Sequence, residues 1–148
     1  MGQQQLLLLV LATVIVGIAT VVGIQAFSQN SAKSNADALM NDAVRIASDV
    51  QAWAQKAQPF GGPATFGDVS SATFGSIGYN ATSGTYSNLN GDFTLNEGLI
   101  TGTNDTDGDT TVDQQVQVRV CGITDADING EVMTVGEVAT GATAPAAC

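Results

Sequence analysis

The stretch that decides the fold is Leu6 to Ile24, LLLLVLATVIVGIATVVGI, nineteen residues without a charge. A helix rises about 1.5 Å per residue, so a helix of this length matches the hydrocarbon thickness of a bilayer and can span it. A cleaved signal peptide is the alternative, and Ile24-Gln25-Ala26 is a tolerable cleavage sequence. The residues before the run, GQQQ, lack the positive charge typical of such a signal, which favours a retained helix.

Small residues occur within the run at a spacing of four. Thr13 and Gly17 form one such pair, and Ala19 and Gly23 form another. This spacing lets two helix backbones approach closely in an apolar medium. Glycine is also common in membrane helices generally, so the spacing alone does not decide between helix packing and composition.

The helical pattern continues beyond the apolar run as an amphipathic stripe. From Ser34 onward the apolar positions recur at steps of three and four, which is the helical period. These positions are Leu39, Ala43, Ile46, Val50, Trp53 and Ala57. The pattern predicts one long helix over residues 1–58, ended by Pro59. Its apolar part, at 1–27, must be covered by lipid or by other copies of the same helix, and its amphipathic part is at 28–58.

Residues 59–148 read as a glycine-rich β domain. Gln115 to Val120 alternates strictly and places three valines on one face, and Glu131 to Val135 is its predicted hairpin partner across Asp127 to Gly130, with an Asn-Gly turn. A second hairpin is predicted from Tyr86–Asn88 and Asp92–Leu95 around Asn90-Gly91. The predicted fold class is α+β: a long N-terminal helix whose amphipathic half packs on a small antiparallel sheet. The helix residues expected to contact that sheet are Leu39, Ala43, Ile46, Val50 and Trp53.

The charge distribution excludes several functions. The formal net charge is −10, and after residue 58 Arg119 alone faces eleven acidic residues. An acidic surface repels phosphates, and no basic patch with interleaved aromatics is present, so no nucleic acid partner is predicted. The chain contains no histidine, no nucleophile elbow and no phosphate-binding glycine loop, so we predict that it is not an enzyme.

Cys121 and Cys148 are the two cysteines. They form a poor zinc set and a plausible disulfide if the domain lies outside the cytoplasm. Closing that loop would contribute roughly 3 kcal/mol in the chain-entropy model. Two unrelated free thiols are the alternative.

One acidic loop carries candidate metal ligands and two sequons carry candidate glycosylation sites. Asp105, Asp107, Asp109 and Asp113 gather around Gly108, and carboxylate oxygens suit calcium. The EF-hand pattern fails, since Thr103 and Gln114 would occupy its first and last ligand positions, and a solvated acidic loop is the favoured interpretation. No other cofactor is predicted. Asn80 and Asn104 begin N-glycosylation sequons, which also occur often by chance.

A short polar start, an apolar run, an amphipathic helical continuation and a glycine-rich β domain with one internal and one terminal cysteine together resemble a type IV pilin. The resemblance implies a structural subunit of an extracellular, pilus-like filament on the cell surface. Such a subunit is anchored in the inner membrane by its apolar helix, and with the help of the pilus assembly machinery it then polymerises with copies of itself. Adhesion and motility are among the roles that such filaments have.

The resemblance also implies which residues act in assembly. Pilins usually have Glu at the fifth mature residue, thought to pair with the N-terminal amine of a neighbouring subunit. Gln5 stands there if the mature chain begins at Met1, and Leu7 if Met1-Gly2 is removed. No proline interrupts the apolar run, so the helix is expected to stay continuous or to loosen at Gly17 and Gly23. The expected assembly residues are Gln3, Gln4, Gln5, Leu6, Leu9, Thr13, Gly17, Ala19 and Gly23.

Two other functions remain open. In the first, the chain is a minor pilin or pseudopilin of a secretion or uptake system. Its abundance in the cell and the length of its polymers would distinguish this function from that of a major pilin. In the second it is a membrane-anchored module that binds calcium or a partner, and it would then remain a monomer in the membrane. A glycine-rich, acidic domain with few aromatics fits a surface that must not stick to itself, which favours the filament.

Overall fold

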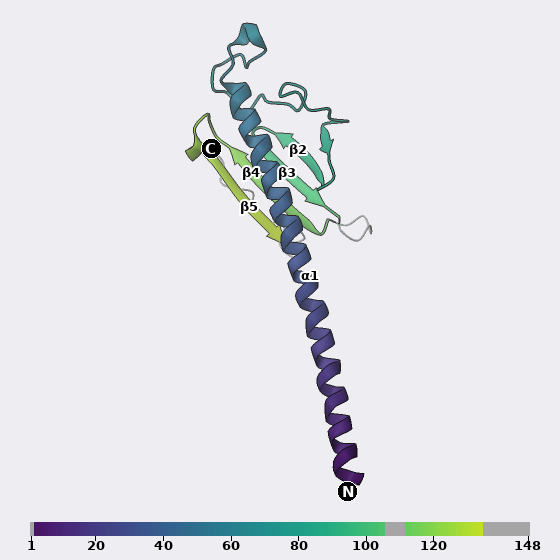
Figure 1. Ribbon diagram of the computed structural model, residues 1–148. Helices are drawn as coiled ribbons and strands as arrows, with labels where there is room; N and C mark the ends of the chain where they lie inside the picture. The colour runs from purple at the N-terminus through teal and green to yellow at the C-terminus, as the bar shows by residue number, and fades with distance from the viewer. Residues whose placement is uncertain (1, 106–111, 135–148) are drawn as a thin grey trace. The chain divides into compact units, whose positions relative to one another are not determined.

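The computed structural model describes residues 2–105 and 112–134, and the chain divides into two compact units, residues 1–34 and 35–148. In the first unit the described residues are helical throughout and belong to α1 (Gly2–Ala54). The second unit contains the rest of α1 and a five-stranded sheet (Figure 1). Its strands are β1 (Thr85–Ser87), β2 (Asp92–Asn96), β3 (Leu99–Asn104), β4 (Gln114–Val120) and β5 (Ile128–Thr134). The predicted α+β fold class is confirmed.

The helix ends at Ala54, earlier than the expected end beside Pro59. Ala57 is extended, with φ −70° and ψ 146°, and the short 3-10 helix η1 (Gln58–Phe60) follows with Pro59 in its first turn. The reason is that the loop beyond the helix supplies partners for its last turn. The indole Nε1 of Trp53 donates to the Gly61 carbonyl at 2.8 Å, and the Gly67 N–H donates to the Ala54 carbonyl at 3.0 Å. These bonds turn the chain back before the proline is reached.

The sheet is a simple meander in which each strand pairs antiparallel with the next in the sequence, in the order β1 to β5. The predicted pairing of the β4 and β5 segments and the predicted pairing around Asn90-Gly91 are both present. β3 was not anticipated. It follows β2 through a tight turn in which Glu97 and Gly98 have φ of 48° and 76°. Two successive left-handed residues are the backbone of a type I′ hairpin turn.

The turn predicted at Asn129-Gly130 is wrong. Both residues belong to β5, where Asn129 lies opposite Arg119 and Gly130 lies opposite Val118. The connection instead occupies residues 121–127 and contains η2 (Asp125–Asp127). It is closed by a capping box between Thr124 and Asp127, in which the Thr124 N–H donates to the Asp127 carboxylate at 3.0 Å. The Thr124 hydroxyl also donates to that carboxylate, at 2.6 Å.

Gly130 is explained by close packing instead of by turn geometry. A Cβ built on Gly130 would lie 3.3 Å from the Met40 sulfur of α1, tighter than most such contacts. The absence of a side chain at 130 therefore lets β5 approach the helix at this point.

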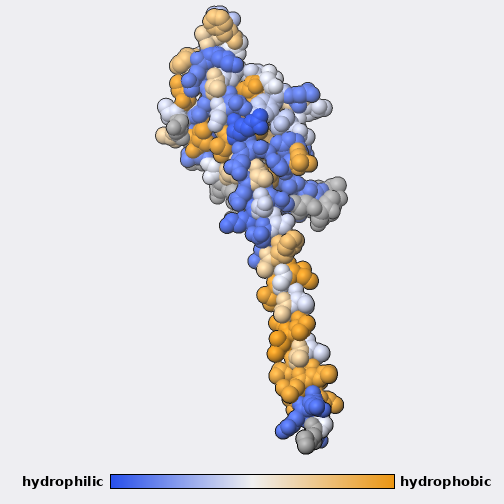
Figure 2. All heavy atoms as spheres, in the orientation of Figure 1, coloured by the Kyte–Doolittle hydropathy of each residue, from blue (hydrophilic) through white to orange (hydrophobic). Residues whose placement is uncertain are grey.

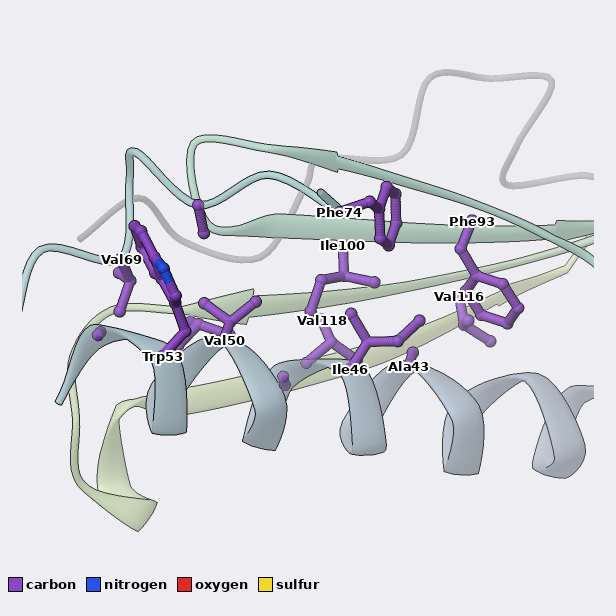
Figure 3. Packing of buried hydrophobic residues seen from close by; sticks show 14 of the residues in the cluster. Ala43, Ile46, Val50, Trp53, Val69, Phe74, Phe93, Ile100, Val116 and Val118 are labelled. Atoms are coloured by element: carbon purple, nitrogen blue, oxygen red, sulfur yellow. The ribbon is translucent and has the colours of Figure 1, made fainter. Parts of the chain in front are cut away.

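The core of the second unit lies between one face of the sheet and residues 39–54 of α1. Ile46 and Val50 point toward the sheet, where Ile46 lies beside Val118, and Trp53 lies beside Val69 (Figure 3). The alternation of β4 is as predicted, with Val116, Val118 and Val120 all buried. The buried cluster comprises Leu39, Ala43, Ile46, Ala47, Val50, Trp53, Ala54, Val69, Ala72, Phe74, Phe93, Ile100, Val116, Val118 and Val120.

Candidate membrane and assembly segment

The apolar segment, defined as Leu6 to Ile24, is helical throughout and exposes every large side chain. The exposed fractions of its Leu, Ile and Val side chains lie between 51% and 71%. Figure 2 shows these hydrophobic side chains covering the visible face of the segment. Because large apolar residues occupy consecutive positions, they surround the helix on all sides, unlike those of an amphipathic helix that lies on a surface. By length and composition the helix can cross a membrane.

The polar groups of this segment are satisfied within the helix. Thr13 and Thr20 are its two residues with polar side chains. The Thr13 hydroxyl donates to the Val10 carbonyl and the Thr20 hydroxyl to the Gly17 carbonyl, each at 2.8 Å. An unpaired hydroxyl in hydrocarbon would cost several kcal/mol, at most about 8 by the harshest transfer scales. The segment can therefore enter an apolar medium with no unpaired hydroxyl.

The small residues of the apolar segment gather on one side of the helix. At 3.6 residues per turn, Thr13, Gly17 and Thr20 form one row along the helix, and Ala12, Ala19 and Gly23 form a second row about 100° further around the axis. A Cβ added at Gly17 or Gly23 meets nothing within 4 Å. Both glycines thus leave open space where a neighbouring helix could lie against the backbone.

The expected polar assembly residues Gln3, Gln4 and Gln5 lie in the first turns of α1, and all three are exposed. Leu6 and Leu9 follow them with 67% and 66% of their surface exposed. Among the described residues of the first unit, none covers these side chains, which are open to lipid or to another chain.

The candidate calcium ligands are only partly described. Asp107 and Asp109 lie outside the described residues, Asp105 is exposed and Asp113 is half-buried. In the described ranges, no group of three or more His, Cys, Asp or Glu side chains is arranged to hold a metal. Calcium binding stays a prediction for this loop.

The two sequons differ in their surroundings. Asn80 is exposed in the long segment before β1. Asn104 is half-buried at the end of β3, where its carbonyl accepts a hydrogen bond from the Asp113 N–H at 3.0 Å. Asn80 is the more accessible of the two for a glycan.

Cys121 follows β4 and is half-buried, and its N–H donates to the Asp127 carbonyl at 2.7 Å. Cys148 lies outside the described residues. The disulfide between the two cysteines therefore stays a prediction.

Three polar contacts on the helix were missed by sequence reasoning. Asp42 accepts hydrogen bonds from the side-chain amides of Asn88 and Asn90, at 2.9 and 2.7 Å. Asp49 accepts one from Tyr79 at 2.6 Å. Each joins positions 30 or more apart in the sequence, so no local pattern signals it.

The third contact is made by Gln51, which is buried on the core side of α1. Its side-chain amide donates to the carbonyls of Gly122 and Thr124, at 2.9 and 2.8 Å. A glutamine among apolar positions was the signal, because a buried amide needs partners. These contacts fasten loops of the second unit to the helix.

Comparison of the chain with protein-family models, with curated proteins and with solved structures finds no match. The features of the chain that bear on its function are the apolar segment and the surface of the second unit. The segment offers hydrophobic surface on all sides, internally satisfied hydroxyls and a side of small residues. This combination is suited to insertion into lipid and to packing against other helices.

Proposed function

We propose that this protein is the structural subunit of a helical, extracellular filament of the type IV pilus class. Its apolar segment would anchor the subunit in a membrane and would then become part of the filament core. The observation that carries the proposal is the exposure of large apolar side chains all along this helix, in a chain that also builds a separate folded β unit. Such a helix needs an apolar environment, which either lipid or other copies of the same helix can supply.

Transfer from lipid to a filament core gains little from the hydrophobic effect, because lipid tails are as apolar as leucine. Assembly must then depend on close packing among many neighbouring helices. The small-residue side around Gly17 supports this mechanism, since open space next to a backbone permits close approach. Thr13 and Thr20 would not oppose it, because their hydroxyls are already paired within the helix.

The charge of the second unit also supports a filament exposed to water. The segments after residue 58 carry eleven acids against Arg119 alone. A surface of one sign keeps finished filaments soluble and apart from one another. An acidic coat also argues against nucleic acid as the partner of this surface.

Electron microscopy of material sheared from producing cells tests the proposal directly. Thin fibres of uniform diameter, with this chain as their main protein by mass spectrometry, are the expected result. The intact mass of the same subunit would show whether two hydrogens are lost to a disulfide between Cys121 and Cys148. Recovery of the chain only as a detergent-soluble monomer would overturn the filament and favour a membrane-anchored binding module. Fibres in which this chain is a trace component would identify it as a minor subunit.

A further inference from the structure

The second unit contains two Asn-Gly pairs, Asn90-Gly91 and Asn129-Gly130. In such a pair the peptide nitrogen of the glycine can attack the side-chain carbonyl carbon of the asparagine, because glycine has no side chain to hinder the approach. Asparagine is therefore a chemically labile residue. The two pairs lie in different structures. Asn129 and Gly130 are paired residues of β5, whereas Asn90 and Gly91 end the loop between β1 and β2.

The fold requires the glycine of the first pair. A Cβ at Gly91 would overlap the carbonyl oxygen of Thr103 and would lie 2.7 Å from a methyl carbon of Leu39, which is fully buried in the core. Only glycine fits where the loop enters β2. Packing thus keeps a labile Asn-Gly pair at this position.

Hydrogen bonds hold both reacting groups of this pair. The Gly91 N–H, which would supply the attacking nitrogen, donates to the side-chain oxygen of Asn88 at 3.1 Å. The side-chain amide of Asn90, which would be attacked, donates to a carboxylate oxygen of Asp42 at 2.7 Å. Asn88 donates its own side-chain amide to the same oxygen, at 2.9 Å. The attack requires the Gly91 N–H to leave Asn88, so the reaction depends on opening of the loop.

Once the loop opens, the reaction runs in one direction. The Gly91 nitrogen forms a bond to the side-chain carbon of Asn90, the side-chain amide leaves as ammonia, and water opens the resulting succinimide ring to aspartate or isoaspartate. One amide and one water thus become one carboxylate and one ammonium ion. At position 90 this carboxylate would stand beside that of Asp42, where the structure has an amide donor. Like charges at hydrogen-bonding distance repel, so the modified loop cannot return to its place on the helix.

We propose that Asn90 is a site of spontaneous deamidation, protected by Asn88 and Asp42, and that its modification irreversibly releases the β1–β2 loop from α1. The co-reactant is water alone. The modified fraction then indicates how often the loop has opened. This modification is a property of the single chain and does not depend on whether filaments form.

The first test measures the rate of deamidation. The full chain in detergent is kept in a warm, mildly alkaline buffer, and the peptides that contain Asn90 and Asn129 are quantified over time by mass spectrometry. Asn88→Ala should accelerate the modification of Asn90 roughly tenfold, the factor expected when one or two hydrogen bonds that close the loop are lost. The rate at Asn129 should not change, because this residue is paired in β5 opposite Arg119.

Asn80→Ala is the matched control variant, since Asn80 is exposed in the segment before β1, and it should leave the rate at Asn90 unchanged. Equal rates at Asn90 in the original chain and in Asn88→Ala would overturn the protective role of Asn88. An Asn90 that stays unmodified in both proteins would overturn the site itself.

The second test separates charge repulsion from the loss of a hydrogen bond. Asn90→Asp reproduces the reaction product and should melt a few degrees below Asn90→Ala, which removes the amide without adding a charge. Addition of Asp42→Asn should restore the melting temperature of Asn90→Asp and should not raise that of Asn90→Ala. Asn129→Asp, which places its new charge opposite Arg119, should melt like the original chain. Equal melting of Asn90→Asp and Asn90→Ala, or no recovery with Asp42→Asn, would refute the release of the loop by Asp42.

Discussion

The hydroxyl of Tyr79 donates a 2.6 Å hydrogen bond to a carboxylate oxygen of Asp49, which lies thirty positions earlier in the chain. Tyr79 also stacks edge-on against Tyr86, with ring centroids 4.8 Å apart. Burial of the phenol, and then its hydrogen bond to Asp49, raise the pKa of Tyr79 from 10.0 to about 12. The contact fixes the segment before β1 to the helix, and it gives the second unit a sensitivity to high pH.

That pKa predicts the pH range in which stability is lost. Because the folded-state pKa is raised above the unfolded value, the contribution of Tyr79 is fully present below pH 10 and is lost as the pH rises toward about 12. Unfolding of the detergent-solubilised chain, followed by circular dichroism across this range, checks the loss. Tyr79→Phe should remove this part of the pH dependence and should cost about 1–2 kcal/mol at neutral pH. Tyr86→Phe is the matched control, and an equal change in both variants would contradict the role of Asp49.

Gly102 is predicted to be intolerant of any side chain. A Cβ at this position would lie 2.7 Å from a ring carbon of Phe93 and 3.0 Å from a methyl of Val116, both fully buried. Gly102→Ala should therefore destabilise the second unit by about 1–3 kcal/mol through overpacking. Gly75→Ala is the control, because the nearest atom to its Cβ is 4.0 Å away. Thermal unfolding measures the stability of both variants. Equal melting temperatures would show that the core can accommodate a methyl group at position 102.

Gln51 is predicted to hold the β4–β5 connection to α1. Gln51→Leu would remove the donor to the carbonyls of Gly122 and Thr124 and should cost about 1–3 kcal/mol. Gln55→Leu, one turn later and exposed, should have little effect. Hydrogen exchange of the amides of residues 121–127 should accelerate only in the Gln51 variant, and unchanged exchange there would mean that the capping box alone holds the connection.

Ile15 lies at the middle of the apolar segment, where a charge is most costly. A lysine at the centre of a membrane helix costs about 2.5–3.5 kcal/mol on insertion scales. Ile15→Lys should therefore reduce the amount of chain that resists alkaline extraction from membranes. Ser28→Lys, beyond the segment, should be retained like the original chain. Equal retention of both variants would show that the segment does not span the bilayer.

A substitution at Gly17 tests the proposed helix packing without impairing membrane insertion. Gly17→Leu makes the segment more apolar, so membrane retention should be unchanged, but it fills the space on the small-residue side. Fibres should become scarce or short in electron micrographs of this variant. Ile18→Leu, which conserves volume on another side of the helix, should assemble normally. Normal fibres from Gly17→Leu would exclude the small-residue side from the helix contacts.

The elements that could be predicted from sequence are those with a sustained period. The helical spacing of Leu39, Ile46 and Val50 and the strict alternation of β4 follow from which residues face the core, and both are present. β3 escaped because Gly102 interrupts its alternation and because Glu97-Gly98 is not among the usual turn pairs. The Asn-Gly pair at 129 misled for the opposite reason: its glycine serves close packing against Met40.

One feature of the candidate functional regions could be predicted from the sequence and another could not. The apolar segment could be predicted from the sequence, because its hydrophobicity is carried by consecutive residues. The brace of Asn88 and Asn90 on Asp42 could not, because it joins positions 46 and 48 apart and depends on how the sheet is placed against the helix.

The strand order of the second unit has a kinetic consequence. Every strand pairs with its neighbour in the sequence, so the sheet can form as a succession of hairpins without long-range strand exchange. Folding rates rise as contacts become more local, because less chain entropy is lost before each contact forms. The docking of α1 residues 39–54 on the finished sheet is then the most non-local event. The second unit therefore has a strand order that lets its sheet form within a single chain.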